Sequence, residues 1–229
     1  MIIPPMFSRI FPFAIYMGFF AIAGVLQFLQ QGGLPLLQGW DPRWLYPTKV
    51  LLVSLALLLL WRNYGELAKP VGIKSSDWLL SVAVGVMVFV VWINLDQSWA
   101  TIGETQGYNP TDPESGRLNW NLIALRIFGA ALVVPLMEEL FWRSFVMRWL
   151  KDADFVNVDP ATVGIKPFFI TAVLFASEHN LWLAGLLAGV AYNWLYMRTR
   201  NLWVPVLAHA VTNCMLGVWV VQTGKWQFW

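Results

Sequence analysis

Charged residues are scarce in this sequence. Asp, Glu, Lys and Arg make up 12% of its 229 residues, whereas a soluble domain carries about 25%. The net charge is only +2, which excludes the strongly basic surface that a nucleic-acid-binding protein needs, so we expect no nucleic-acid partner. A single cysteine, Cys214, excludes an internal disulfide. The first apolar segment is not followed by a small-residue cleavage site, and we therefore expect no cleavable signal peptide.

Apolar residues are abundant instead, at 58% of the chain, and they include 15 tryptophans. A chain in lipid has to satisfy its backbone polar groups internally, which favours helices. The composition therefore predicts an all-α fold, a polytopic integral membrane helical bundle of seven to eight transmembrane helices in the lipid bilayer. We expect a single membrane domain, 1–229, whose catalytic core covers about 119–222.

Seven apolar segments are long enough to form buried or membrane-spanning helices. They are Phe11–Leu29, Pro47–Trp61, Trp78–Leu95, Asn119–Leu150, Pro167–His179, Leu181–Met197 and Leu202–Val221. The fourth would be roughly 48 Å long if straight, more than the ~30 Å hydrocarbon core. Pro135 is expected to kink or split it, which would give an eighth helix. The acid-rich, Gly- and Pro-containing stretch from Asp96 to Asn119 is too polar for lipid and predicts a surface loop.

The distribution of Lys and Arg predicts the orientation in the membrane. With seven crossings, Arg9 and the loops 62–77, 148–166 and 198–200 fall on one side. We therefore expect the N-terminus to be cytoplasmic. The acidic loop and the C-terminus are expected on the outer side.

The stretch Met137-Glu138-Glu139-Leu140-Phe141-Trp142-Arg143 places three charges inside an apolar segment. Charged residues at membrane depth are costly and mark functional sites. Glu139 and Arg143 are four residues apart on a helix, with the acid on the N-terminal side, the favourable order for an ion pair. Glu138 is rotated by about 100° and has no partner at this spacing. This pattern predicts Glu138 as a general base and Glu139 as a structural anion.

Two further polar clusters lie in the apolar segments. His179 ends the run from Phe175, and His209 and Asn213 share one face of the last helix. Counted from the basic helix ends, the depths are about 17 Å for Glu139, 18 Å for His179, 10 Å for His209 and 16 Å for Asn213. The spacing therefore predicts one site in a single layer of the cytoplasmic half.

Other residues of these segments have simpler interpretations. Gly185 and Gly189 are expected to let two helices pack closely. Phe175 is expected in the core, and Arg126 to extend toward the external surface. Glu178 could be a fifth member of the site or could face the loop, and the second is the one we expect.

Three motifs occur in order: Glu138-Glu139-x-x-x-Arg143, Phe175-x-x-x-His179 and His209-x-x-x-Asn213. Together they resemble the CAAX-protease and bacteriocin-processing family of intramembrane proteases over about residues 120 to 215. The resemblance implies catalytic roles for Glu138, His179, His209 and Asn213, with support from Glu139 and Arg143. It implies a peptide or protein substrate at the membrane and, for a bacterial member, the cytoplasmic (inner) membrane. The resemblance does not identify the substrate, since many bacterial relatives have no prenylated target. It does not predict an oligomeric state either.

The same residues suit peptide hydrolysis, which needs an activated water and a stabiliser for the oxyanion. Glu138 is the candidate base, His179 a group that positions the water, and His209 and Asn213 candidate donors to the oxyanion. Ser144 and Ser177 have no evident triad, which argues against a serine nucleophile.

Two alternatives remain open at this point. One is a zinc-dependent protease with Glu138, His179 and His209 as ligands. The sequence lacks HExxH, and an amide such as Asn213 is a poor zinc ligand, so we expect no cofactor. The other is a scaffold or transporter in which the polar cluster serves binding or proton transfer. The lack of internal repeats argues against a transporter.

Overall fold

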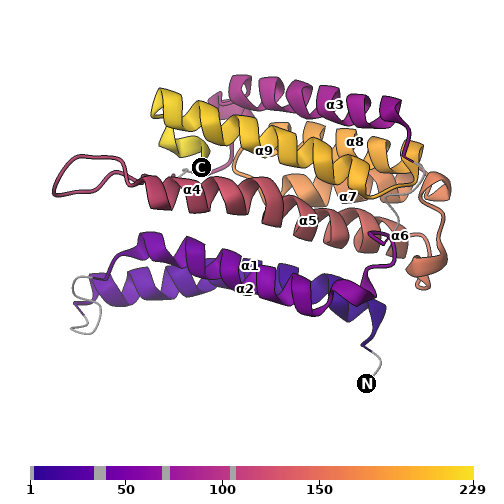
Figure 1. The fold of residues 1–229 in the computed structure, drawn as a ribbon, viewed down its shortest axis with the longest axis horizontal. Coiled ribbons are helices and arrows are strands. Elements are labelled where there is room, and N and C mark those ends of the chain that lie inside the picture. The colour runs from indigo at the N-terminus through magenta and orange to yellow at the C-terminus, as the bar shows by residue number, and fades with distance from the viewer. Residues whose placement is uncertain (1–2, 34–39, 69–72, 104–106) are drawn as a thin grey trace.

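The computed structural model describes residues 3–33, 40–68, 73–103 and 107–229. This part of the chain folds into seven helices and contains no β-sheet (Figure 1). Six of them are α1 (Pro5–Gln31), α2 (Leu45–Leu59), α3 (Ser75–Asn94), α7 (Ile165–Ala176), α8 (Trp182–Thr199) and α9 (Trp203–Thr223). The seventh runs from Trp120 to Trp149. The predicted all-α architecture is therefore confirmed.

Four helices are long and apolar enough to cross a membrane: α1, α3, the helix from Trp120 to Trp149, and α9. The 12 residues of α7 correspond to only about 18 Å, well short of the ~30 Å hydrocarbon core. The outward side of α1 exposes large apolar side chains such as Ile22, Val25 and Phe28, as expected of a surface in contact with lipid. The structure is an integral membrane helical bundle, while seven to eight crossings remain a prediction.

The long helix from Trp120 to Trp149 is continuous, so the predicted split at Pro135 is wrong. It consists of α4 (Trp120–Phe128), α5 (Val134–Glu138) and α6 (Met147–Trp149), joined by the π-helical turns Gly129–Val133 and Glu139–Val146. Proline lacks a backbone N–H and crowds the carbonyl four residues before it. Wider π turns re-route the hydrogen bonds on either side, and this lets the helix pass Pro135 without ending.

Helices α1 and α2 lie side by side along one side of the bundle, next to the long helix (Figure 1). The ring of Phe13 in α1 stacks on Phe141 with centroids 3.7 Å apart. Helices α3, α7, α8 and α9 cover the opposite side of the long helix. The motif-bearing helix is therefore enclosed on both sides.

One cluster of ionic and polar side chains, the Arg9 cluster, consists of Arg9, Glu66, Ser144 and Arg148. Arg9 Nη2 lies 2.6 Å from Glu66 Oε2, and Arg148 Nη2 lies 3.4 Å from Glu66 Oε1. The hydroxyl of Ser144 donates to Glu66 and accepts from Arg9 and Arg148. Burial alone would raise the pKa of Glu66, but the charge of Arg9 and the hydrogen bonds from Arg9 and Ser144 lower it below its ordinary value. The hydroxyl of Ser144 thus links the long helix to α1 and to the segment after α2. It is engaged in these hydrogen bonds and is not placed to act as a nucleophile.

The Arg9 cluster also shows that basic segments distant in sequence gather at one end of the bundle. The start of α1, the segment after α2 and the end of the long helix meet there. Arg200, after α8, approaches Asp159 at 3.4 Å. The predicted orientation in the membrane requires these basic segments to lie at the same end of the bundle. Lys69, which belongs to the same basic loop, lies outside the described residues.

Helices α7 and α8 pack closely because α8 carries glycines at the contact. A Cβ atom built at Gly189 would lie 3.1 Å from the Cα atom of Ala172, and one at Gly185 would lie 3.3 Å from Ala176. The predicted packing role of both glycines is confirmed. The close approach brings the turn after α7, with His179, against the motif helix.

Candidate active site

The first motif forms the predicted ion pair. Arg143 Nη1 donates to Glu139 Oε1 at 3.1 Å, and both side chains are fully buried. Glu138 ends α5, and Glu139 begins the following π turn. The two adjacent carboxylates therefore have different surroundings, as the spacing predicts.

Arg143 is also held by residues outside the motif. Its Nε donates to Asn193 Oδ1 of α8 at 3.0 Å, and its guanidinium lies 4.4 Å from the ring centroid of Phe175. Asn193 in turn donates to the carbonyl of Phe168 in α7 at 2.9 Å. Asn193 is absent from the residues predicted from the sequence. The sequence signal that could have identified Asn193 is an amide within an apolar helical segment. Such an amide has to find hydrogen-bond partners within the bundle, and Asn193 is indeed fully buried.

His209 is oriented by Glu139 and by an aromatic ring. Its Nδ1 lies 3.0 Å from Glu139 Oε1, and because a carboxylate only accepts, Nδ1 carries the proton. The imidazole stacks on Tyr192, with centroids 5.0 Å apart. The Tyr192 hydroxyl donates to Thr212 Oγ1 at 2.8 Å. This arrangement directs Nε2 of His209 toward Glu138, 4.0 Å from its Oε2.

His179 lies in the turn that follows α7. Its Nδ1 is 2.9 Å from the carbonyl oxygen of Phe175 and donates to it. Trp92 of α3 packs edge-on against the ring at 5.3 Å. A neutral His179 held in this way presents an unprotonated Nε2, which can accept a hydrogen bond from water.

Among the described residues, Glu138 and Glu139 each have one buried oxygen without a hydrogen-bond partner, and they differ because the other oxygen of Glu139 is paired with Arg143 and His209. The Oε2 of Glu138 is buried, and no hydrogen-bond partner for it exists among the described residues. Buried polar atoms of native proteins are almost always satisfied, and an exception requires an explanation. A carboxylate oxygen left in this state is available to accept a proton from a reacting water.

Asn213 has a structural contact that the sequence does not reveal. Its Nδ2 donates to the carbonyl oxygen of Ala130 at 2.7 Å. Ala130 lies in the first π turn of the long helix. One amide hydrogen of Asn213 therefore ties α9 to the long helix, and the second amide hydrogen and Oδ1 remain for other partners.

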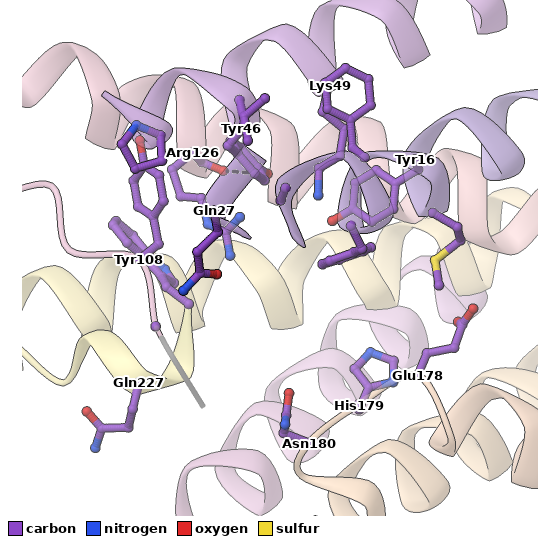
Figure 2. Close-up of a pocket in the computed structure, with 18 of the residues that line it drawn as sticks. Tyr16, Gln27, Tyr46, Lys49, Tyr108, Arg126, Glu178, His179, Asn180 and Gln227 are labelled. Carbon is purple, nitrogen blue, oxygen red and sulfur yellow. Dashed lines mark hydrogen bonds between the residues drawn. The ribbon is translucent and has the colours of Figure 1, made fainter. Parts of the chain in front are cut away.

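The structure brings the four residues with predicted catalytic roles around one cavity of about 150 Å³. Glu138, His179, His209 and Asn213 all line it. Glu138 and His179 also border a larger cavity of about 960 Å³ (Figure 2). This second cavity extends to Gln31, Trp40 and Gln227, at the end of the bundle opposite the basic loops.

Two charged residues are placed differently from the predictions. Glu178 does not face only the loop: it lines the larger cavity, and Trp142 Nε1 donates to its Oε2 at 3.0 Å. Arg126 does not extend to the surface: it lines the same cavity with its guanidinium 4.1 Å from the ring centroid of Tyr46. Both side chains point into the cavity. The helical periodicity of the sequence does not predict this direction, because it depends on which helices pack next to each residue.

The zinc alternative requires Glu138, His179 and His209 to converge on one point. Among the described residues, no three His, Cys, Asp or Glu side chains gather closely enough to hold a metal ion. The three candidate ligands share a cavity without forming such a group. The expectation that the site binds no metal stays a prediction.

Comparisons with known proteins agree with the motif-bearing half of the structure. Residues 119–215 match the family model described as "Type II CAAX prenyl endopeptidase Rce1-like". The chain is also similar to "Putative membrane peptidase YdiL" of Bacillus subtilis (strain 168), with 26% identity over 91 residues. That similarity covers 40% of this chain and 35% of the relative, so the chain spans about a third of its length. No solved structure gives a significant match. Residues 119–215, somewhat less than half of the chain, are thus similar to the Rce1-like family of CAAX prenyl endopeptidases.

Proposed function

We propose that this protein is an intramembrane endopeptidase of the CAAX-protease type, which cleaves a membrane-associated peptide with a water molecule activated by Glu138. The observation that carries the proposal is the unpartnered, buried Oε2 of Glu138, 4.0 Å from His209 Nε2 in a cavity. A base that abstracts a proton needs a free lone pair within hydrogen-bond reach of the water.

The first step uses two acceptors that face each other, Glu138 and Nε2 of His209. In this proposal His209 holds the water and does not donate to the oxyanion, which differs from the role predicted from the sequence, because Glu139 accepts the proton on Nδ1. A water molecule between the two acceptors donates one hydrogen to Glu138 and the other to the unprotonated Nε2 of His209. Its own lone pair is left for the attack. As the water oxygen bonds to the peptide carbonyl carbon, its proton passes to Glu138. The C–N bond then breaks, and Glu138 returns the proton to the leaving nitrogen.

Glu139 and Arg143 support this step without contacting the substrate. One oxygen of Glu139 accepts from both Arg143 and His209, at 3.1 and 3.0 Å. The carboxylate of Glu139 fixes the ring orientation and the tautomer of His209. Nε2 of His209 is therefore left unprotonated and can accept a hydrogen bond from the water that Glu138 activates. Arg143 neutralises the buried carboxylate that would otherwise repel Glu138.

Asn213 and His179 act on the substrate side of the cavity. The second amide hydrogen of Asn213 donates to the oxyanion that develops on the carbonyl oxygen. Its contact with Ala130 holds the amide in place before the reaction, and a donor that needs no reorganisation is the most effective kind. His179 positions the water or the peptide through its free Nε2.

Peptide hydrolysis in an enzyme with this site needs no bound metal. The support is chemical: the nearby Arg143 carries a fixed positive charge, and Asn213 is a poor metal ligand. Elemental analysis of active, chelator-treated protein should find no stoichiometric zinc. Zinc at one per chain, with activity lost on its removal and restored on its return, would promote the metalloprotease mechanism.

The test of the function is a comparison of membrane-protein termini by mass spectrometry in cells with the wild-type protein or Glu138→Gln. New termini should appear only with the wild type. A matched control is Glu114→Gln, the same chemical change in an exposed loop, which should behave as wild type. Termini that are identical in all three strains, together with no cleavage by purified protein, would favour a scaffold or transporter.

A further inference from the structure

Two cations of the larger cavity have no role in the hydrolysis described above. Lys49 of α2 is only 6% exposed, although it lies in a segment that is otherwise mostly Leu and Val. Arg126 of α4 has a buried Nε without a hydrogen-bond partner. Both side chains line the cavity of about 960 Å³. Two charges inside a membrane helix bundle are costly unless something compensates them.

Aromatic rings hold both cations next to each other. Lys49 Nζ lies 3.8 Å from the ring centroid of Tyr16 and 4.3 Å from that of Phe20. The ring of Tyr46 lies between the two charges, 5.2 Å from Lys49 Nζ and 4.1 Å from Arg126 Cζ. Cation–π contacts offset part of the cost of burial, but they do not neutralise the charge.

The two cations lack a directly paired carboxylate among the described residues. Within the described part of the chain, neither Lys49 nor Arg126 forms an ion pair, although five arginine–carboxylate pairs occur. The two carboxylates of the same cavity, Glu138 and Glu178, contact His209 and Trp142 instead. Like charges that share a cavity repel each other, and an anion placed between them would remove the repulsion.

Amide side chains accompany the cations along this cavity. Gln27, Asn180 and Gln227 line it, with Lys49 and Arg126 on the wall opposite His179 and Glu178 (Figure 2). Amides can pair with the N–H and C=O groups of an extended peptide. A lipid headgroup needs no such partners, so the lining favours a peptide as the source of the anion.

We propose that Lys49 and Arg126 form an anion-binding site that holds a carboxylate of the peptide substrate while Glu138 acts on a peptide bond of the same molecule. This inference rests on the proposed peptidase function. The carboxylate is either the free C-terminus of the peptide or an acidic side chain, and both sources offer the same bidentate chemistry to a guanidinium. The site would fix the distance between the carboxylate and the bond that is cleaved.

Binding, not hydrolysis, is the first readout, so that failure of this proposal differs from failure of the peptidase function. The full-length protein with Glu138→Gln, in detergent, is titrated with a dansylated hexapeptide of alternating alanine and leucine. Three forms are compared: a free C-terminal acid, a C-terminal amide, and the amide with one leucine replaced by glutamate. We expect the acid, the glutamate form or both to bind roughly tenfold to hundredfold more tightly than the plain amide.

The cations are then tested in the same assay. Arg126→Gln and Lys49→Met should remove most of the preference for the carboxylate without changing the binding of the plain amide. Arg126→Lys should keep part of it. Arg117→Gln, an exposed arginine outside the cavity, is the control and should keep all of it. If one of these variants fails to fold, the comparison of the three peptides on the Glu138→Gln protein, in which Lys49 and Arg126 are intact, still tests the proposal.

Two results would overturn the proposal. One is equal affinity for all three peptides. The other is displacement of every peptide by dihexanoyl phosphatidylglycerol without any preference for a carboxylate, which would assign the cations to a lipid phosphate. If peptides with a carboxylate are preferred but no peptide is ever hydrolysed, the anion site stands and the peptidase function fails.

Discussion

Glu139 Oε1 and His209 Nδ1 lie 3.0 Å apart, although the two residues are 70 positions apart in the chain. The same oxygen accepts from Arg143. One carboxylate therefore links the Glu-Glu motif of the long helix to the His-Asn motif of α9. The adjacent Glu138 has no such links and faces the cavity with its free oxygen.

The two carboxylates should respond differently to the same substitution. Glu138→Gln should abolish hydrolysis and leave the melting temperature in detergent close to that of wild type. Glu139→Gln should also lower the free energy of unfolding, by up to about 3–5 kcal/mol, because it leaves Arg143 buried without its counter-ion. Thermal unfolding of purified variants, together with a cleavage assay, measures both effects. If Glu138→Gln were the more destabilised variant, the two roles would have to be exchanged.

Asn213 should affect the rate of the reaction more than the binding of the substrate. Removing one oxyanion donor typically lowers kcat by about 10²–10³, so Asn213→Ala should do the same with little change in KM. Its hydrogen bond to Ala130 predicts an added loss of about 1 kcal/mol in stability. A variant with full kcat and reduced stability would show that Asn213 only joins the two helices.

The Arg9 cluster should make stability depend on pH on the acidic side. The pKa of Glu66 is lowered in the folded protein, so its contribution is complete above the unfolded pKa, about 4.3. It is lost as the pH falls through the lower, folded-state pKa. Wild type should be more stable than Glu66→Gln at pH 7, by on the order of 3 kcal/mol. The difference between their melting temperatures should shrink as the pH is lowered toward 3. A difference that stays constant over this range would mean that the charge of Glu66 does not contribute.

Labelling of single introduced cysteines should test the topology, in a Cys214→Ser background. Positions near Arg62, Lys151 and Arg200 should be protected from an impermeant reagent added outside the cell. Positions near Asp112 and Trp229 should react. In that orientation, Gln31 and Gln227, which line the larger cavity, lie near the outer side. Reaction near Arg62 and Asp112 from the same side would contradict the span assignment.

Much of this structure is predictable because the membrane limits the choices. Apolar segments gave the helices to within a few residues: the segment Phe11–Leu29 lies within α1, and Leu202–Val221 nearly coincides with α9. The i,i+4 spacing of Glu139 and Arg143 predicted their ion pair for the same reason. These features depend only on local periodicity and on the cost of charge in lipid.

Features that depend on several helices at once are not predictable in this way. Lys49 is compatible with lipid only because rings from α1 and α2 surround it. Asn193 matters because Arg143 reaches it from another helix. The inward direction of Arg126 and Glu178 likewise follows from their neighbours. Rules for single helices contain no information about such contacts.

The π turns around Pro135 have a consequence for how this helix tolerates insertions and deletions. A π turn is the structural equivalent of an additional residue within an α-helix. Removing one residue from Gly129–Val133 would convert that turn to α-helical geometry. The residues before it would then rotate by about 100°, and Arg126 would leave its place beside Tyr46. The length of this segment should therefore be under stronger selection than the identity of its apolar side chains.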